Sequence, residues 1–175
     1  MEVLQVQEEL DWITRLYQEK RPKRVLEIGC YDGGTLKVWL ENGAPELVLA
    51  IDIDHRNLDA YEEWRQPDTK LLVETEDSHG DVGRSKIITA GPYDWVFIDG
   101  DHEPGPVSMD VALTLPLVRH GGVLVLHDIV MGTRNLPNNG PGGVFDEMQR
   151  SGMRTESFVA QSDREEGHGY GVVYR

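Results

Sequence analysis

Short apolar runs, each ending at or beside a carboxylate, recur along the chain and constrain its fold more than any other feature. The segments between these runs space their apolar residues as helices do. The runs themselves are continuously apolar rather than alternating, which is typical of parallel strands buried on both faces of a sheet. The pattern predicts an α/β fold of the Rossmann-like, doubly wound type, with helices on both faces. The first five expected strands cover residues 24–29, 46–52, 69–74, 93–99 and 121–128.

The rest of the chain completes the expected topology. Two further strands, 156–161 and 169–175, have no helix between them, so we expect an antiparallel hairpin at one edge of the sheet. The sheet is then seven-stranded and mostly parallel with the last strand antiparallel, in a single domain over residues 1–175. A loop rich in Gly, Pro and Asn is expected at 130–143. The expected helices cover residues 3–19 (within an N-terminal helical segment, 1–20), 32–41, 55–65, 78–89, 104–114 and 144–149.

The charge of the chain argues against a nucleic-acid partner. The formal net charge is −14, and the lysines and arginines form no basic run, whereas binding to a phosphate backbone needs clustered cations. No apolar run approaches the roughly 20 residues that span a bilayer, so no membrane association is expected. The N-terminus does not have the pattern of a secretory signal. A single cysteine, Cys30, suits a reducing cytoplasm. We therefore expect a cytoplasmic protein with a small-molecule substrate.

The turn after the first expected strand, EIGCYDG from Glu27 to Gly33, favours a cationic ligand over a pyrophosphate. Turns that bind a dinucleotide need a glycine two residues after the first one, where this chain has the bulky Tyr31. The acid at Glu27, two residues before Gly29, attracts a cation and repels a phosphate. Asp52 follows roughly 20 residues after Gly29, where an acid can bind both hydroxyls of a ribose.

These residues and two later motifs resemble the class I S-adenosylmethionine-dependent methyltransferases. The motifs FIDGDH, ending at His102, and GGVLVLHD, ending at Asp128, resemble a narrower group. This group contains small O-methyltransferases, some of them metal-dependent, and cephalosporin-hydroxylase-like proteins. The resemblance covers nearly the whole chain and implies S-adenosylmethionine as the cofactor.

The resemblance also implies which residues bind that cofactor. Gly29 and Gly33 would line its amino-acid end, with Glu27 beneath it, and Asp52 would hold the ribose. Asp77 and Ser78 would lie at the adenine. The complete set implied for the cofactor is Glu27, Gly29, Cys30, Tyr31, Gly33, Asp52, Ile53, Asp77, Ser78 and Asp99.

Asp99 and Asp128 end the fourth and fifth expected strands and are candidate ligands of Mg²⁺ or another divalent cation. Adjacent strands lie about 4.8 Å apart, so both carboxylates can reach one ion. Such an ion would lower the pKa of a substrate hydroxyl. Metal-dependent relatives usually place a second acid or amide after the strand-five aspartate, where this chain has Ile129. If His127 is instead the first of the pair, imidazole replaces an oxygen ligand and a softer metal is favoured. Without a metal, the carboxylates would bind substrate hydroxyls directly.

His102 is the first candidate for a general base, because a histidine titrates near neutral pH. A loop histidine that only hydrogen-bonds the backbone is the competing interpretation. His127 competes for the base role, and Asp99 completes the candidate catalytic set. His79 and His168 have no motif around them and receive no role.

Other conspicuous side chains are expected to pack rather than react. Cys30 is interpreted as a small buried residue against the cofactor crevice rather than as a nucleophile. The tryptophans are expected in the core. The 130–143 loop follows the fifth strand beside Asp128, and we expect it to cover the substrate. The tryptophans are Trp12, Trp39, Trp64 and Trp95.

The function implied by the resemblance is methyl transfer to an oxygen of a small hydroxylated metabolite. In such a displacement the enzyme mainly positions donor and acceptor. The chain has no large insertion, so the N-terminal helix, the 130–143 loop or a partner subunit, as in a homodimer, must cover the acceptor. Two alternatives remain. An NAD-linked oxidoreductase is disfavoured by Tyr31, and a non-catalytic cofactor-binding domain has no need of carboxylates at the fourth and fifth strands.

Overall fold

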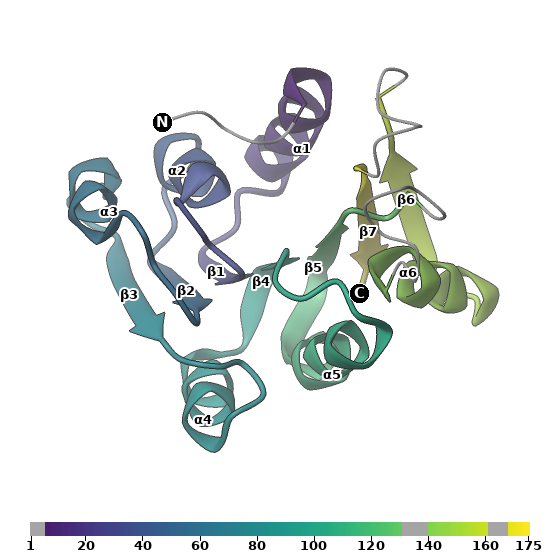
Figure 1. Cartoon of the computed structure of the whole chain (residues 1–175). Coiled ribbons are helices and arrows are strands. Elements are labelled where there is room, and N and C mark those ends of the chain that lie inside the picture. Colours follow the sequence, from purple (N-terminus) through teal and green to yellow (C-terminus); the bar gives the residue numbers. More distant parts are fainter. Residues whose placement is uncertain (1–5, 131–139, 161–167) are drawn as a thin grey trace.

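A seven-stranded sheet forms the centre of the computed structural model, which describes residues 6–130, 140–160 and 168–175 (Figure 1). The strands lie in the order β3-β2-β1-β4-β5-β7-β6. The pairs among β1 to β5 are parallel, and β7 is antiparallel to both of its neighbours, which confirms the expected topology. The strands are β1 Arg24–Ile28, β2 Leu47–Asp52, β3 Lys70–Thr75, β4 Tyr93–Ile98, β5 Val118–His127, β6 Arg154–Phe158 and β7 Tyr170–Tyr174.

Helices cover both faces of the sheet, as the sequence predicts. One face carries α1, α2 and α3, and the other carries α4, α5 and α6 (Figure 1). Among the described residues, no helix is long and apolar enough to cross a membrane. The helices are α1 Gln7–Lys20, α2 Gly34–Glu41, α3 Leu58–Trp64, α4 Asp81–Ala90, α5 Pro104–Thr114 and α6 Gly140–Arg150, with a short 3₁₀ helix at Leu115–Leu117.

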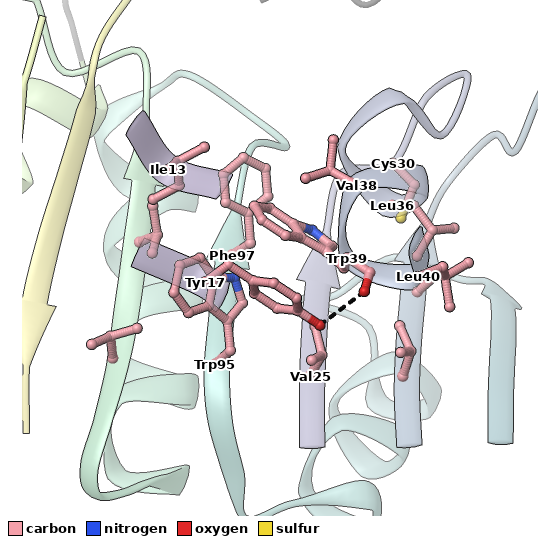
Figure 2. Close-up of a cluster of buried hydrophobic side chains, with 14 of the residues drawn as sticks. Ile13, Tyr17, Val25, Cys30, Leu36, Val38, Trp39, Leu40, Trp95 and Phe97 are labelled. Carbon is pink, nitrogen blue, oxygen red and sulfur yellow. Dashed lines mark hydrogen bonds between the residues drawn. The ribbon is translucent and has the colours of Figure 1, made fainter. Parts of the chain in front are cut away.

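Aromatic side chains fill the layer between the sheet and α1 and α2 (Figure 2). Tyr17 packs edge-on against Trp95, and its hydroxyl donates a hydrogen bond to the backbone carbonyl of Trp39 at 3.0 Å. Both tryptophans are fully buried, as expected, and Cys30 lies in the same cluster, whereas Trp12 and Trp64 are only partly buried and pack against it. Burial of one large apolar side chain contributes roughly 1.5–3 kcal/mol, so this layer fixes α1 and α2 on the sheet.

The order in which strands are added to the sheet changes direction between β1 and β4. From β1 the strand order runs outward to β2 and β3 on one side and to β4 and β5 on the other. Ligands of doubly wound sheets bind outside the carboxyl ends of the strands at such a point. The ends of β1 and β4 therefore mark where a ligand site is expected.

Helix α6 begins earlier than the sequence predicts. The expected loop at 130–143 extends into the helix, which starts at Gly140, and residues 131–139 lie outside the described part of the chain. Proline is tolerated in a first helical turn, so Pro141 does not exclude a helix start. Gly140 is required by packing, because a Cβ there would lie 2.5 Å from the His102 carbonyl oxygen. Gly140 and Pro141, which indicate a loop in the sequence, therefore form the first turn of a helix that packs closely against the backbone of His102.

Candidate functional site at the carboxyl ends of β1, β4 and β5

Gly29, directly after β1, lies against the backbone that follows β4. Its φ angle is +84°, a conformation that favours glycine. Its N–H donates to the Ile51 carbonyl at 3.0 Å, and a Cβ would lie only 2.2 Å from the Asp99 carbonyl oxygen. A side chain at this position would separate the ends of β1 and β4, so glycine keeps the crevice in shape.

The carboxylate of Asp52, at the end of β2, holds the first turn. Its Oδ2 accepts hydrogen bonds from the N–H groups of Cys30 at 2.6 Å and Tyr31 at 2.8 Å. Its Oδ1 accepts one from the N–H of Asp54 at 3.0 Å. Oδ2 accepts two of these bonds and Oδ1 only one, so Oδ1 keeps a lone pair with which Asp52 can still accept a ligand hydroxyl.

The side chain of Glu27 is entirely buried beneath this turn. Its Oε1 accepts a hydrogen bond from the Thr35 hydroxyl at 2.5 Å, while Oε2 has no hydrogen-bond partner among the described residues. Burial raises the pKa of Glu27 to about 8, the Thr35 hydrogen bond opposes the rise, and the charge of Asp99 adds to it. A cation bound nearby would favour the ionised form of this carboxylate.

Three other residues of the predicted cofactor set belong to the turn or adjoin it. Gly33 has a φ of +81°, and a Cβ there would lie 2.4 Å from the Tyr61 ring. Cys30 is buried, which agrees with a packing role. Tyr31 is half exposed, and the Arg56 guanidinium lies over its ring, 4.1 Å from the centroid. The ring thus fills the place where a pyrophosphate-binding turn would need a glycine.

A cleft of about 430 Å³ runs from the first turn past the carboxyl ends of β2 and β3. Its lining includes Glu76, Asp101 and Asp110, to which the sequence assigns no role, and among the described residues it includes no lysine or arginine. A wall of carboxylates without cations is unfavourable for a phosphate group. Most of the predicted cofactor residues lie in this cleft, namely Gly29, Tyr31, Asp52, Ile53, Asp77, Ser78 and Asp99.

A buried carboxylate on α5 holds the residues that follow β3. Asp110 accepts a hydrogen bond from the Ser78 hydroxyl at 2.8 Å, and the same oxygen lies 3.1 Å from Nε2 of His79. Burial raises the pKa of Asp110, while Ser78 and His79 act in the opposite direction. Asp77 accepts a hydrogen bond from the His79 N–H at 2.9 Å. The adenine role expected for Asp77 and Ser78 stays a prediction.

A second cleft, of about 290 Å³, lies on the other side of the first turn. Gly29, Tyr31 and Asp99 line both clefts, so they form the boundary between them. Five histidine and aspartate side chains that line the second cleft, Asp99 among them, form a group that we call the His–Asp cluster. Its members are Asp99, His102, His127, Asp128 and His168.

The His–Asp cluster brings three imidazoles to two carboxylates. Nδ1 of His127 lies 3.1 Å from Asp99 Oδ1 and 3.4 Å from Asp128 Oδ1. Nε2 of His102 lies 3.0 Å from Asp128 Oδ2 and 3.7 Å from Asp99 Oδ1. Nδ1 of His168 lies 3.1 Å from Asp128 Oδ1. The sequence-predicted residues of β4 and β5 therefore converge, and His168 joins them.

The charges of the cluster shift one another's pKa values. The interaction with Asp128, followed by that with Asp99, raises the pKa of His102 to about 10. Burial alone would lower the pKa of His127, but Asp99 and Asp128 outweigh it and raise the value to about 9. Burial would raise the pKa of Asp99, but His127 and His102 lower it to about 2. His102 can act as a general base only after its proton is displaced, so that role stays a prediction.

His168 is the residue of the second cleft that sequence reasoning misses, and topology explains its position. Because β7 is antiparallel to β5, the start of β7 lies beside the end of β5, with His127 paired to Tyr170. The expected antiparallel hairpin was the signal that could have placed His168 at this site.

Helix α1 holds the segment that carries His168. Glu9 is fully buried, and its Oε1 accepts a hydrogen bond from the Ala160 N–H at 2.8 Å. Its Oε2 accepts one from the Gly169 N–H at 3.1 Å. The N–H of Val130 bonds the His168 carbonyl at 3.1 Å from the other side. The backbone around His168 is therefore fixed by α1 and by the segment after β5.

Comparisons with known proteins agree with this architecture. Residues 26–129 match a family described as Methyltransferase domain. No curated protein matches the chain.

Solved structures share the fold. The O-methyltransferase from Bacillus cereus, in complex with SAH, has a TM-score of 0.73 and 18% identity and covers 100% of this chain and 84% of its own. The O-methyltransferase TomG from Streptomyces achromogenes, in complex with SAM, has a TM-score of 0.63 and 19% identity, and the match covers 98% of this chain and 81% of TomG. The MycE methyltransferase, in complex with Mg, SAH and mycinamycin VI, has a TM-score of 0.64 and 18% identity, covering 94% of this chain and 47% of its own.

Proposed function

The chain belongs to the family of methyltransferase domains, and from this premise we propose that it transfers a methyl group from S-adenosylmethionine to an oxygen of a small hydroxylated acceptor. The observation that carries the proposal is the pairing of two clefts on either side of one glycine turn. One cleft has the carboxylates for a nucleoside, and the other has the histidines and carboxylates for chemistry on a hydroxyl.

The residues of the first cleft fit S-adenosylmethionine. When bound, this cofactor supplies a methyl group whose carbon an oxygen nucleophile can attack, with the positively charged sulfur leaving as a neutral thioether. The buried Glu27, with one carboxylate oxygen unpartnered among the described residues, favours the positive charge of the amino-acid end. Asp52 would accept the ribose hydroxyls, and Asp77 and Ser78 would lie at the adenine. Gly29 would let the backbone of the turn approach the ligand closely.

The residues of the second cleft would position the acceptor. Asp99, Asp128 and His102 face one another from β4, β5 and the loop after β4. Together they would orient the acceptor hydroxyl, and His102 or His127 would take its proton once that histidine has lost its own. A divalent cation held by Asp99 and Asp128 would stabilise the resulting oxyanion. A domain that only bound the cofactor would have no use for this group of side chains.

The proposal extends to the domain organisation, the cellular location and the oligomeric state of the protein. We propose a single catalytic domain over residues 1–175 that works in the cytoplasm on a small-molecule substrate. A partner subunit in a homodimer would help to cover the second cleft. The expected cover over residues 130–143 lies mostly outside the described residues.

The test begins with ligand binding, because a ligand of the native state raises the unfolding temperature by mass action. S-adenosylmethionine and its demethylated product should raise it and should bind in calorimetry, whereas NAD should not. Incubation with hydroxylated metabolites should then yield a product heavier by one methyl group in mass spectrometry. Binding of NAD without any response to the two sulfur compounds would overturn the proposal.

A further inference from the structure

We propose that the His–Asp cluster binds one divalent transition-metal ion through imidazole as well as carboxylate ligands, and that it selects such an ion over Mg²⁺. Zn²⁺ and Co²⁺ are suitable probes. The inference deepens the proposed function, since the ion would lie where the acceptor is expected. Its test measures metal binding alone and does not depend on methyl transfer.

The spacing of the side chains fits a shared ion. Two sets of three ligand atoms lie within 4.8 Å of one another, namely His127, Asp128 and His168, and Asp99, His102 and Asp128. Two ligands that are each about 2.1 Å from a metal lie about 3.0–3.4 Å apart at octahedral or tetrahedral angles. The closest approaches in the cluster, 3.0 to 3.4 Å, fall in this range. Asp128 belongs to both sets, so its carboxylate is at the centre of the proposed site.

A network of hydrogen bonds and ion pairs is the competing explanation, and two contacts fit it, because Nδ1 of His127 bonds Asp99 and Nδ1 of His168 bonds Asp128, each at 3.1 Å. One contact argues against it. Nε2 of His102 is buried and lies 3.0 Å from Asp128 Oδ2, yet it makes no hydrogen bond to any described residue. The two atoms are close without the alignment that a hydrogen bond needs. Two ligands that point at a common ion have this relationship.

The chemistry of the ligands selects the class of metal. Mg²⁺ prefers oxygen ligands and keeps several of its waters, whereas imidazole suits Zn²⁺, iron, copper and nickel. Three of the five side chains in the cluster are imidazoles. Ile129 follows Asp128, so this position cannot supply a further side-chain oxygen ligand for Mg²⁺. Its N–H bonds the Gly169 carbonyl at 3.4 Å, and this contact joins the segment after β5 to the one that carries His168.

The position of the cluster would allow a bound ion to hold the acceptor hydroxyl. The cluster and residues of the first turn line the same 290 Å³ cleft. An acceptor hydroxyl bound to the ion would therefore be held beside that turn. Because imidazole ligands must be neutral to bind a metal, occupancy would also remove protons from the histidines.

The experiment uses the full chain, stripped with chelator and dialysed. Calorimetry with Zn²⁺, Co²⁺ and Mg²⁺ separately should give one site per chain for the first two ions, bound at least 100-fold more tightly than Mg²⁺. The Co²⁺ protein should show visible absorption bands of nitrogen-containing coordination. His168→Ala and Asp128→Asn should weaken Co²⁺ binding at least tenfold, whereas the exposed His120→Ala should not change it.

Other outcomes overturn the inference in distinct ways. Equal or tighter binding of Mg²⁺ would show an oxygen-selective site, and no binding of any ion would show an ion-pair network. Binding of S-adenosylhomocysteine by His168→Ala, at wild-type affinity, serves as the check that this variant is folded. If Co²⁺ binds as expected and no sulfur cofactor binds, the metal site stands and the proposed function fails.

Discussion

The backbone of Gly29 is in contact with that of Asp99, and this contact joins the two clefts of the candidate site. A Cβ at Gly29 would lie 2.2 Å from the Asp99 carbonyl oxygen. Asp99 itself lines both clefts, as Gly29 does. Any change that separates these two residues would therefore disturb the cofactor side and the acceptor side together.

Gly29→Ala should destabilise the protein by at least about 2 kcal/mol, because it combines a strained positive φ with a backbone clash. Urea unfolding measures the loss. Gly105→Ala is the matched control, since a Cβ at this position in α5 meets nothing within 4 Å. It should change stability by less than about 1 kcal/mol. Equal effects of the two substitutions would show that the contact with Asp99 is not important.

Asp52→Ala should weaken binding of S-adenosylhomocysteine at least tenfold, which corresponds to about 1.5–3 kcal/mol for hydrogen bonds to a charged group. It should also lower the stability of the free protein, because the N–H groups of Cys30 and Tyr31 lose their acceptor. Calorimetry and urea unfolding separate the two effects. Asp54→Ala, with a side chain that is 70% exposed, should leave both quantities almost unchanged. Unchanged affinity in Asp52→Ala would exclude the ribose role.

Glu27 should make stability depend on pH. Its pKa is about 8 in the folded protein and 4.5 in the reference state, so between these values the folded protein keeps a proton that the unfolded chain has lost. Stability from this group is therefore complete below pH 4.5 and is lost as the pH rises through 8. Glu27→Gln should remove this decline, so that the variant gains stability relative to wild type between pH 6 and 9 in urea unfolding. A constant difference between the two proteins across this range would contradict the shift.

The same carboxylate should link cofactor binding to proton release. A cationic ligand favours ionised Glu27, so affinity for S-adenosylmethionine should rise between pH 6 and 8. Calorimetry at pH 7 in two buffers of different ionisation enthalpy should detect the released proton. The Glu27→Gln variant should bind more weakly and should release less. Identical heats in both buffers for the wild-type protein would show that Glu27 keeps its proton on binding.

Glu9→Ala should destabilise the protein by about 2–4 kcal/mol, because two buried backbone N–H groups, of Ala160 and Gly169, lose their acceptor. Glu9→Gln should lose less, since its amide keeps one acceptor oxygen. The adjacent and exposed Glu8→Ala provides the control and should be neutral within about 0.5 kcal/mol. Urea unfolding of the three variants is sufficient. A neutral Glu9→Ala would mean that the backbone around His168 is held by other contacts.

Most of the fold could be predicted because apolar runs and helical spacing are local signals. The seven strands and the antiparallel end of the sheet follow from which runs are separated by helices. The start of α6 could not be predicted this way, since Gly140 and Pro141 have the composition of a loop. Only the close approach of Gly140 to the His102 carbonyl oxygen explains a helix there.

Some residues of the candidate site could be predicted from the sequence, and others could not. Asp52, Asp99 and Asp128 were predictable because each ends a strand, and parallel topology brings strand ends together. The roles of Asp110 and His168 were not, because each depends on a contact between elements far apart in sequence. Asp110 lies on α5 and bonds Ser78 after β3, and His168 reaches Asp128 across the antiparallel pair of β7 and β5.

The carboxylate of Glu9 joins α1 to two segments far along the sequence, and this affects the order in which the chain can fold during its synthesis. Its backbone partners, Ala160 and Gly169, lie 151 and 160 residues further along the sequence. A ribosome makes the chain from the N-terminus, so α1 can form early but can complete these two bonds only after Ala160 and Gly169 have been added. The final seating of α1 and the placement of His168 are therefore one late event in the folding of a newly made molecule.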